Sequence, residues 1–126
     1  MVFVLEVVGI GHYTIDFLGI IPYYPPLNAR ICLEKLYRQG GGEAATAMVI
    51  LARLEVPVAF VRKIGDDKIG SMIRAGLNQE NVDTSGLVVQ PGGQSLWAFG
   101  AGEKNSGKRT LFWHKNLTSY NRLTLN

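Results

Sequence analysis

The stretch GGGEAATAMVILARL, residues 40–54, decides how this chain folds. The three consecutive glycines lack a Cβ, so their backbone can adopt positive φ and lie against a ligand. After Glu43, only Thr46 and Arg53 are polar, and the other residues are apolar or small. This pattern predicts a helix over Glu43–Leu54 that is buried on most of its circumference. Free N–H groups at its start would suit an anion or sugar hydroxyls, but a plain turn before a core helix would have the same sequence.

The flanking segments predict further strands and a second helix. Val2–Ile10 is an almost continuous apolar run bounded by glycine, which is typical of a strand buried on both faces of a parallel sheet. Val56–Val61 is predicted to be a further strand, and Leu87–Val89 a short one. Asp66–Asn78 has an apolar stripe at helical spacing, with Asp66 or Asp67 as a natural N-cap. The chain is therefore expected to adopt an α/β fold.

The order of these segments resembles a known family. A Gly41-Gly42 pair opens an Ala-rich helix that ends in Arg53-Leu54, and a strand and the segment GDDKIG (residues 65–70) follow. This arrangement resembles the N-terminal signature of the PfkB, or ribokinase-like, carbohydrate kinases, from about Val7 to about His114. The resemblance implies the N-terminal part of a ribokinase-like three-layer sandwich with a small antiparallel β lid. It also implies ATP-dependent phosphorylation of a sugar hydroxyl by the complete enzyme, with ATP and Mg²⁺ as cofactors.

Asp16 is the main candidate for binding a sugar. It follows the first predicted strand, and ligands of open α/β sheets bind beyond the carboxyl ends of strands. A carboxylate can accept hydrogen bonds from two neighbouring hydroxyls, although an Asp here could also be solvated or cap a turn. In the resembled family an Asp at this place holds the substrate hydroxyls, whereas His12 and Tyr13 are expected to be structural. The expected sugar-facing surface is Asp16 with Gly40, Gly41 and Gly42, Thr46 at its margin, and Trp97 or Phe99 as walls.

Two predicted strands, about Phe17–Ile21 and Arg30–Tyr37, flank the proline-stiffened loop Pro22–Asn28. The second strand alternates in polarity, which is typical of an exposed antiparallel strand. The resemblance implies that these strands are inserted as a lid over the sugar and often serve as a dimer contact. A homodimer through the lid strands is therefore expected, although a hairpin packed on its own domain is the alternative. The apolar residues that could line a covered lid face are Ile21, Tyr23, Tyr24 and Leu27.

Ser95–Ala101 and Thr110–His114 are predicted to form a hairpin. Its connection, Gly102–Arg109, nearly matches a phosphate-binding P-loop, but that motif needs Ser or Thr where Arg109 stands and a helix afterwards. A polar hairpin turn is the preferred interpretation. Gly100-Ala101-Gly102-Glu103 is similar to the Gly-Ala-Gly-Asp that carries the catalytic base of the family. It lacks the preceding Asp-Thr and has Glu in place of Asp, so no catalytic role is assigned to Glu103 or to any other residue.

The resemblance also has departures. Ala45 stands where the family commonly has a sugar-binding Asn, and neighbouring Thr46 could substitute for it. Glu55 stands where a Gly usually ends the helix, so the helix end is expected to differ. The chain has 126 residues, far fewer than a complete kinase of the family, and its tail Lys115–Asn126 is polar. We therefore expect a single truncated domain over residues 1–126 that recognises the sugar, lacks the catalytic C-terminal half and binds no cofactor alone. The alternative is a non-catalytic module that binds a sugar or nucleoside or mediates oligomerisation.

Composition excludes several other classes of function. The net charge is +3 and the basic residues are scattered, so nucleic-acid binding has no support. Cys32 is the lone cysteine, which is compatible with a reducing cytoplasm and leaves no internal disulfide. No apolar run reaches transmembrane length and no secretory signal is evident, so we expect a cytoplasmic protein without a membrane partner. No metal site is expected.

Overall fold

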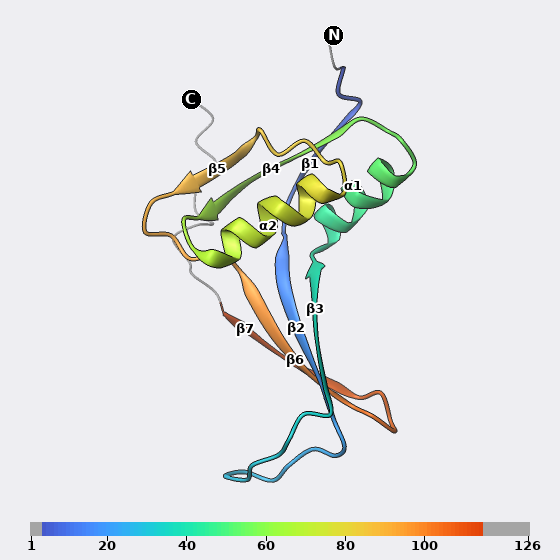
Figure 1. The fold of residues 1–126 in the computed structure, drawn as a ribbon, viewed down its shortest axis with the longest axis vertical. Coiled ribbons are helices and arrows are strands. Elements are labelled where there is room, and N and C mark those ends of the chain that lie inside the picture. Colours follow the sequence, from blue (N-terminus) through green and yellow to red (C-terminus); the bar gives the residue numbers. More distant parts are fainter. Residues whose placement is uncertain (1–3, 115–126) are drawn as a thin grey trace.

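The computed structural model describes residues 4–114, so the tail Lys115–Asn126 and the start of the predicted first strand lie outside the described residues. Its elements are β1 (Val7–Ile10), β2 (Thr14–Ile21), β3 (Lys35–Gly41), α1 (Glu43–Arg53), β4 (Val58–Gly65), α2 (Lys68–Gln79), β5 (Leu87–Gln90), β6 (Trp97–Glu103) and β7 (Arg109–His114). They form a three-stranded sheet with the order β1-β4-β5 and a four-stranded sheet with the order β3-β2-β6-β7 (Figure 1).

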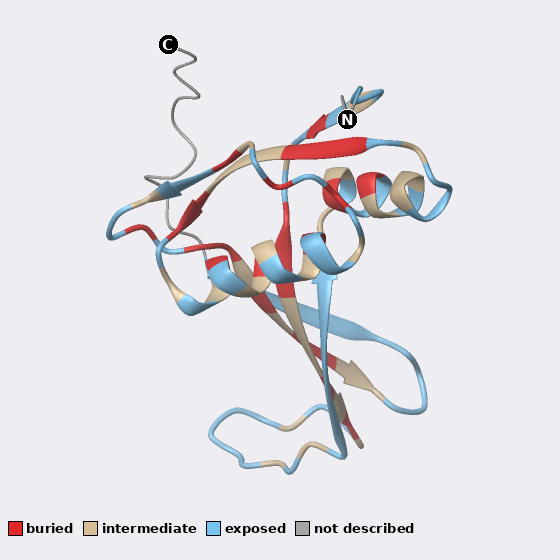
Figure 2. Ribbon diagram, turned by 45° about the horizontal axis from the view of Figure 1, so that its top comes forward, coloured by how far each residue is buried: buried red, intermediate tan, exposed pale blue. Residues whose placement is uncertain are grey.

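The three-stranded sheet is the central sheet, and its strands are all parallel. Val58, Phe60 and Ile64 of β4 point toward the two helices and pack with residues of α1 and α2 in one core, in which Phe60 is fully buried. Figure 2 shows this core as buried segments along β4 and on the helices. Val8 and Ile10 of β1 are exposed on the opposite face of the sheet. The described residues thus supply the sheet and one helical layer of the α/β sandwich expected from the sequence.

The four-stranded sheet projects away from the central sheet (Figure 1). We call this sheet, together with the loop of residues 22–34, the lid. β2 pairs antiparallel with β3 and parallel with β6, and β6 pairs antiparallel with β7. The predicted hairpin at β6 and β7 is confirmed. The sequence did not indicate that this hairpin joins the lid, which is therefore a mixed sheet and larger than the expected pair of antiparallel strands.

Both lid strands begin at other residues than predicted; β2 ends at Ile21 as predicted, and β3 ends later, at Gly41. β2 begins at Thr14, so Asp16 lies inside a strand and not in a loop. β3 continues through Gly40 and Gly41, because Gly41 pairs with Thr14 in the register of the two strands. Among the three glycines only Gly42 has a positive φ, at 101°. The turn into α1 is therefore made by one glycine, and the other two belong to the lid.

The loop of residues 22–34 is attached to the β6–β7 hairpin. The hydroxyl of Tyr24 donates to the carbonyl oxygens of Ala101 (2.8 Å) and Lys108 (3.1 Å), and Lys104 forms an ion pair with Glu34 at 3.2 Å. Of the apolar residues predicted to line a covered lid face, Ile21 is buried at 2% exposure, whereas Leu27 is almost fully exposed. The loop therefore packs against the sheet of the lid.

The GDDKIG segment, residues 65–70, closes the turn between β4 and α2. Asp67 is the N-cap of α2, and its carboxylate accepts hydrogen bonds from the N–H of Gly70 (2.9 Å) and from the N–H and hydroxyl of Ser95 (2.8 and 2.7 Å). Ser95 Oγ in turn accepts a hydrogen bond from the N–H of Gly65 at 2.9 Å. Asp66 accepts from the N–H of Gly92 instead, at 3.0 Å. Of the two N-cap candidates, Asp67 is the one that caps the helix.

The helices α1 and α2 end in the same hydrogen-bonded turn. In α1 the N–H of Glu55 donates to Ala52 and the N–H of Val56 donates to Leu51, both at 3.0 Å. This Schellman arrangement places Glu55 in the left-handed region, with φ 63°. The expected change in helix ending is wrong, because Glu55 adopts the conformation that suits glycine. Neither helix of the described residues 4–114 is long and apolar enough to span a membrane.

Candidate functional site

A cavity of about 780 Å³ lies where the lid meets α1 and the end of β1. Its volume is in the range of small-molecule sites. One face of the lid contributes Thr14, Asp16, Ala98, Arg109, Leu111 and Trp113, and we call this the site face. The start of α1 contributes Gly42, Glu43, Ala44 and Thr46. The cavity therefore combines three segments of the chain, within residues 10–16, 42–46 and 98–113.

Asp16 presents its carboxylate to this cavity from β2. Within residues 4–114, no side chain or backbone group donates a hydrogen bond to this carboxylate, so its oxygens can accept from a ligand. Gly41 of β3 lies beside it, and a Cβ on Gly41 would overlap Asp16 Oδ2 and lie 2.7 Å from Thr14 Oγ1. A glycine at this position therefore leaves room around the carboxylate.

The start of α1 faces the same cavity. Gly42 has no side chain to cap the helix, so the first N–H groups of α1 lack a side-chain acceptor. A Cβ on Gly42 would overlap the carbonyl oxygen of His12, so only glycine fits this turn. Thr46 lines the cavity, whereas Ala45 is 1% exposed and belongs to the core. An Asn in place of Ala45 would therefore begin from the core, and Thr46 is the neighbour that faces the cavity.

Gly40 and Tyr13 face the core side of the lid. A Cβ on Gly40 would overlap the hydroxyl of Tyr13, so the structure places Gly40 against this ring and not in the cavity. Burial raises the pKa of the Tyr13 hydroxyl, and the negative charges of Glu80 and Asp16 raise it further. A neutral, buried phenol packed against Phe60 fits the structural role expected for Tyr13.

Trp97 and Phe99 lie on the face of the lid opposite Asp16. In β6 the even-numbered residues share a face with Asp16, since Asp16 pairs with Ala98, and the odd-numbered residues point away. Trp97 contacts Phe17 edge-on and stacks on His114, and Phe99 stacks on Phe112. The structure therefore does not bring the two expected walls to the cavity.

Arg109, Leu111 and Trp113 of β7 form that wall instead. Sequence reasoning missed them, although a signal existed in the small residues at alternate positions of β6, which are Ala98, Gly100 and Gly102. A Cβ on Gly100 would lie 2.8 Å from both Leu18 and Leu111, so these side chains close over the strand. Small residues at alternate strand positions mark the face that neighbouring groups approach closely.

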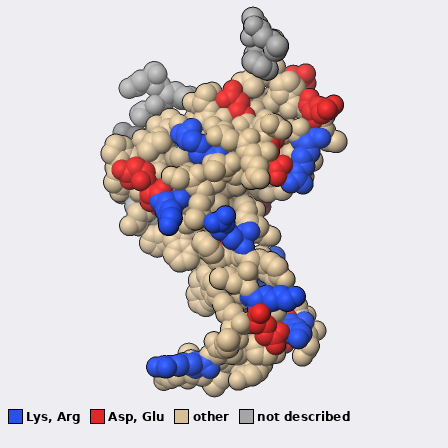
Figure 3. Space-filling model, in the orientation of Figure 1, with Lys and Arg blue, Asp and Glu red and all other residues tan. Residues whose placement is uncertain are grey.

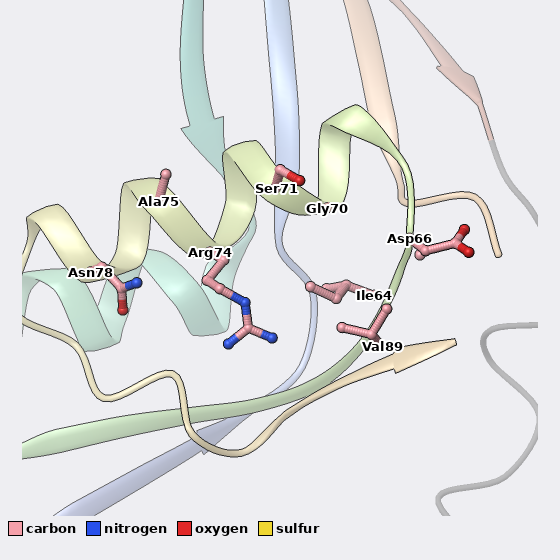
Figure 4. Close-up of a pocket in the computed structure, with 9 residues that line it drawn as sticks. Ile64, Asp66, Gly70, Ser71, Arg74, Ala75, Asn78 and Val89 are labelled. Carbon is pink, nitrogen blue, oxygen red and sulfur yellow. The ribbon is translucent and has the colours of Figure 1, made fainter. Parts of the chain in front are cut away.

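A second cavity of about 280 Å³ lies between α2 and the strands β4 and β5 (Figure 4). Figure 4 shows Arg74 directed into the space below the helix, near Ile64 and Val89. Arg74 donates to the carbonyl oxygen of Thr84 at 3.2 Å, and Asp66 accepts from Gly92. Because these charged groups already serve the packing of α2 and the adjacent turns, no ligand is assigned to this cavity.

The charged side chains are mixed on the surface. Figure 3 shows Lys and Arg interspersed with Asp and Glu on the visible face, without a continuous basic patch. Among residues 4–114 no group of three or more His, Cys, Asp or Glu side chains could hold a metal ion. The turn between β6 and β7 leads into a strand, so it lacks the helix that a P-loop requires. The polar hairpin turn expected at this place is confirmed.

Comparisons with known proteins identify the family. The sequence profile described as "pfkB family carbohydrate kinase" matches residues 6–125. Fructokinase-1 of Oryza sativa subsp. japonica is 32% identical over 113 residues, which cover 87% of this chain and 32% of that protein. The ATP-dependent ribose-1-phosphate kinase of Halopiger xanaduensis is 29% identical over 91 residues, 72% of this chain and 31% of that protein. The 5-dehydro-2-deoxygluconokinase of Clostridium botulinum is 33% identical over 91 residues, which cover 72% of this chain and 26% of that protein.

Solved structures agree in fold. An Arabidopsis thaliana ribokinase complexed with ribose and ATP superposes with a TM-score of 0.78 at 19% identity, over 89% of this chain and 36% of that one. A Cryptococcus neoformans ribokinase in complex with ADP superposes with a TM-score of 0.72 at 22% identity, over 88% of this chain and 35% of that one. The chain thus spans about a third of the length of the relatives it matches. The match over residues 6–125 means that this chain belongs to the pfkB family of carbohydrate kinases.

Proposed function

We propose that this chain provides the sugar-recognising N-terminal portion of a PfkB-type carbohydrate kinase. In the complete enzyme this portion would hold a sugar whose hydroxyl receives a phosphoryl group from ATP in the presence of Mg²⁺. Acting on sugars or their derivatives is what the names of the relatives have in common. We keep the cytoplasm as the proposed location, since Cys32 is an exposed free thiol.

The observation that carries the proposal is the Asp16 carboxylate, which faces the cavity without a hydrogen-bond donor from residues 4–114. Two sugar hydroxyls can donate to this carboxylate in place of solvent. Gly41 leaves the space for them, and the uncapped start of α1 adds N–H donors from the other side. The proposed contact residues are Asp16, Gly41, Gly42 and Thr46, with Trp113 and Leu111 as apolar walls.

We assign no step of phosphoryl transfer to the described residues. The transfer needs a base for the attacking hydroxyl and a cradle for the phosphate charge. Residues 4–114 contain no cluster that fits a metal ion, and their Gly-rich turn precedes a strand. We therefore propose that these residues alone do not hold ATP and Mg²⁺ for the reaction, and that the chain alone does not phosphorylate sugars.

A non-catalytic module that binds a sugar or nucleoside, or that mediates oligomerisation, is the second candidate. The exposed apolar residues of the lid favour a role in association, and Leu36 and Phe112 are the most exposed of them on the core side of the lid. The two candidates differ in one requirement. Only the first requires a further polypeptide that restores ATP-dependent turnover when it is added to this chain.

Two measurements test the proposal. Isothermal titration of the purified chain with D-fructose and D-ribose should detect binding that Asp16→Ala weakens by at least tenfold, because two charge-assisted hydrogen bonds are lost. Glu103→Ala is the matched control, because Glu103 lies at the far end of β6 and bonds Ser106. A coupled assay of ADP release should show no turnover above a heat-killed sample. Equal affinity of wild type and Asp16→Ala would contradict the sugar site. Turnover by the chain alone would contradict the proposal that this chain does not phosphorylate sugars by itself.

A further inference from the structure

Arg109 stands apart from the other residues of the site face. It is the one Lys or Arg among the described residues that line the Asp16 cavity, and it begins strand β7. Within residues 4–114 no carboxylate forms an ion pair with Arg109, whereas Lys104 and Arg53 are paired with Glu34 and Glu80. The cavity therefore contains a guanidinium that no carboxylate of residues 4–114 pairs with.

The position of Arg109 relative to Asp16 follows from the sheet register. Asp16 pairs with Ala98, and Arg109 pairs with Gly102, so the two residues are two strands apart and four residues apart along the sheet. Strand spacing and rise then separate their Cα atoms by roughly 16 Å. Both side chains line the same cavity, so a single ligand that extends along it can contact both.

The residues between Asp16 and Arg109 offer little to a second polar group. Ala98 forms a small-residue floor, and Leu111 and Trp113 form an apolar wall. Glu43 lies near the start of α1, as Asp16 does, so the negative side chains are at one end of the cavity and Arg109 is at the other. A guanidinium has five donors and no acceptor, cannot be deprotonated, and matches a carboxylate or phosphate in geometry.

We propose that the substrate of this cavity is an anionic sugar derivative, whose hydroxyls bind Asp16 and whose carboxylate or phosphate binds Arg109. This inference rests on the proposed sugar site and adds the charge class of its ligand. A neutral sugar could satisfy Asp16 but would leave Arg109 with solvent alone. Because Arg109 is exposed, its contribution is at the lower end for a charge-assisted hydrogen bond, about tenfold in affinity.

Matched ligand pairs test the charge class by isothermal titration of the full chain. D-Gluconate has a carboxylate where D-sorbitol has a hydroxymethyl group. Ribose 1-phosphate has a phosphate that D-ribose lacks. In each pair wild type should bind the anion about tenfold more tightly, and this preference should shrink in high salt. A preference in only one pair would identify the anionic group as the carboxylate or the phosphate.

Three variants separate this inference from the sugar site itself. Arg109→Gln should remove the preference for the anion and leave the affinity for the neutral member unchanged, whereas Arg30→Gln, in the exposed loop away from the cavity, should change neither. Asp16→Ala should weaken both members of each pair. Equal binding of anion and neutral sugar by wild type, or a preference that survives Arg109→Gln, would overturn the anionic substrate and leave the sugar site intact. Absence of all binding, or binding that Asp16→Ala does not weaken, would overturn both. Matching unfolding midpoints establish that each variant is folded.

Discussion

Gly41 and Asp16 lie side by side on the site face of the lid, so close that a Cβ on Gly41 would overlap the carboxylate oxygen Oδ2 of Asp16. Gly41 is not among the glycines with positive φ, so its backbone conformation does not require glycine. The position is restricted by space alone. The Asp16 carboxylate is thus accessible to a sugar because residue 41 has no side chain.

Gly41→Ala should displace the Asp16 carboxylate and weaken sugar binding by at least tenfold, because the hydrogen bonds of a charged acceptor are lost. The matched control is Gly102→Ala on β6, where a Cβ would meet its nearest neighbour at 3.9 Å, an ordinary contact. Titration calorimetry with the same sugar compares the two variants. Unchanged affinity in Gly41→Ala would mean that Asp16 does not contact the sugar from its observed position.

Glu55→Gly should increase the free energy of unfolding by about 1 kcal/mol, since a non-glycine residue pays a steric cost in the left-handed region. Asn81 ends α2 in the same conformation, with φ 61°. Asn tolerates this conformation, so Asn81→Gly should have a smaller effect. Urea unfolding of the two variants measures the difference. A Glu55→Gly variant that is no more stable than wild type would contradict the described end of α1.

Asp67 should make stability depend on pH in the acid range. Burial alone would raise the pKa of its carboxyl, but the hydrogen bonds from Ser95 and Gly70 outweigh burial and hold the pKa below the ordinary value of 3.8. The carboxylate therefore stabilises the fold fully above the unfolded-state pKa, and this contribution is lost as pH falls through the lower folded-state pKa. Asp67→Ala should cost about 1–2 kcal/mol at pH 7, as expected for a lost N-cap.

The difference in unfolding free energy between wild type and Asp67→Ala should narrow between pH 5 and pH 2. Asp66→Ala is the control, because Asp66 accepts one exposed hydrogen bond and should cost less at pH 7. Chemical denaturation at a series of pH values provides the measurement. A difference that stays constant or widens on acidification would show that the Asp67 carboxylate does not stabilise this turn.

Association through the lid is a further prediction. Phe112 of β7 is 61% exposed and Leu36 of β3 is 60% exposed, both on the core side of the lid, and exposed apolar strands tend to be buried by self-association. Sedimentation velocity should find a dimer at micromolar concentrations. Phe112→Glu should shift it toward monomer, whereas Ile50→Glu on the exposed side of α1 should not. A monomeric wild type over this range would count against the lid contact.

The sequence predicted the local elements well and the lid sheet poorly. Both helices and the β6–β7 hairpin follow from periodicity, capping and turn residues, which are local signals. The parallel pairing of β2 with β6 joins residues about eighty positions apart, as in Ile15 with Trp97, and no local pattern indicates it. That pairing decides which side of β6 faces Asp16. The prediction that Trp97 or Phe99 forms a wall of the cavity is therefore wrong, because both side chains pack on the other face.

The site was predicted in part for the same reason. Asp16, Gly42 and Thr46 follow from the family resemblance and line the cavity, and Gly41 borders Asp16. Gly40 could not be separated from its neighbours, because its role depends on contact with the Tyr13 ring. Arg109 belongs to a stretch whose sequence indicates only a near match to a P-loop. Its position in the cavity depends on the register of β7, which the sequence alone does not specify.

An amide ¹H–¹⁵N NMR titration of this chain with D-ribose and D-gluconate tests directly whether the sugar binds beside Asp16. The largest shift changes are expected at Asp16, Gly41 and Thr46, around the lid cavity. Amides of the second cavity, such as Ser71 and Asn78, should change little. Changes confined to the second cavity, or none at millimolar ligand, would contradict the assignment of the sugar site to Asp16.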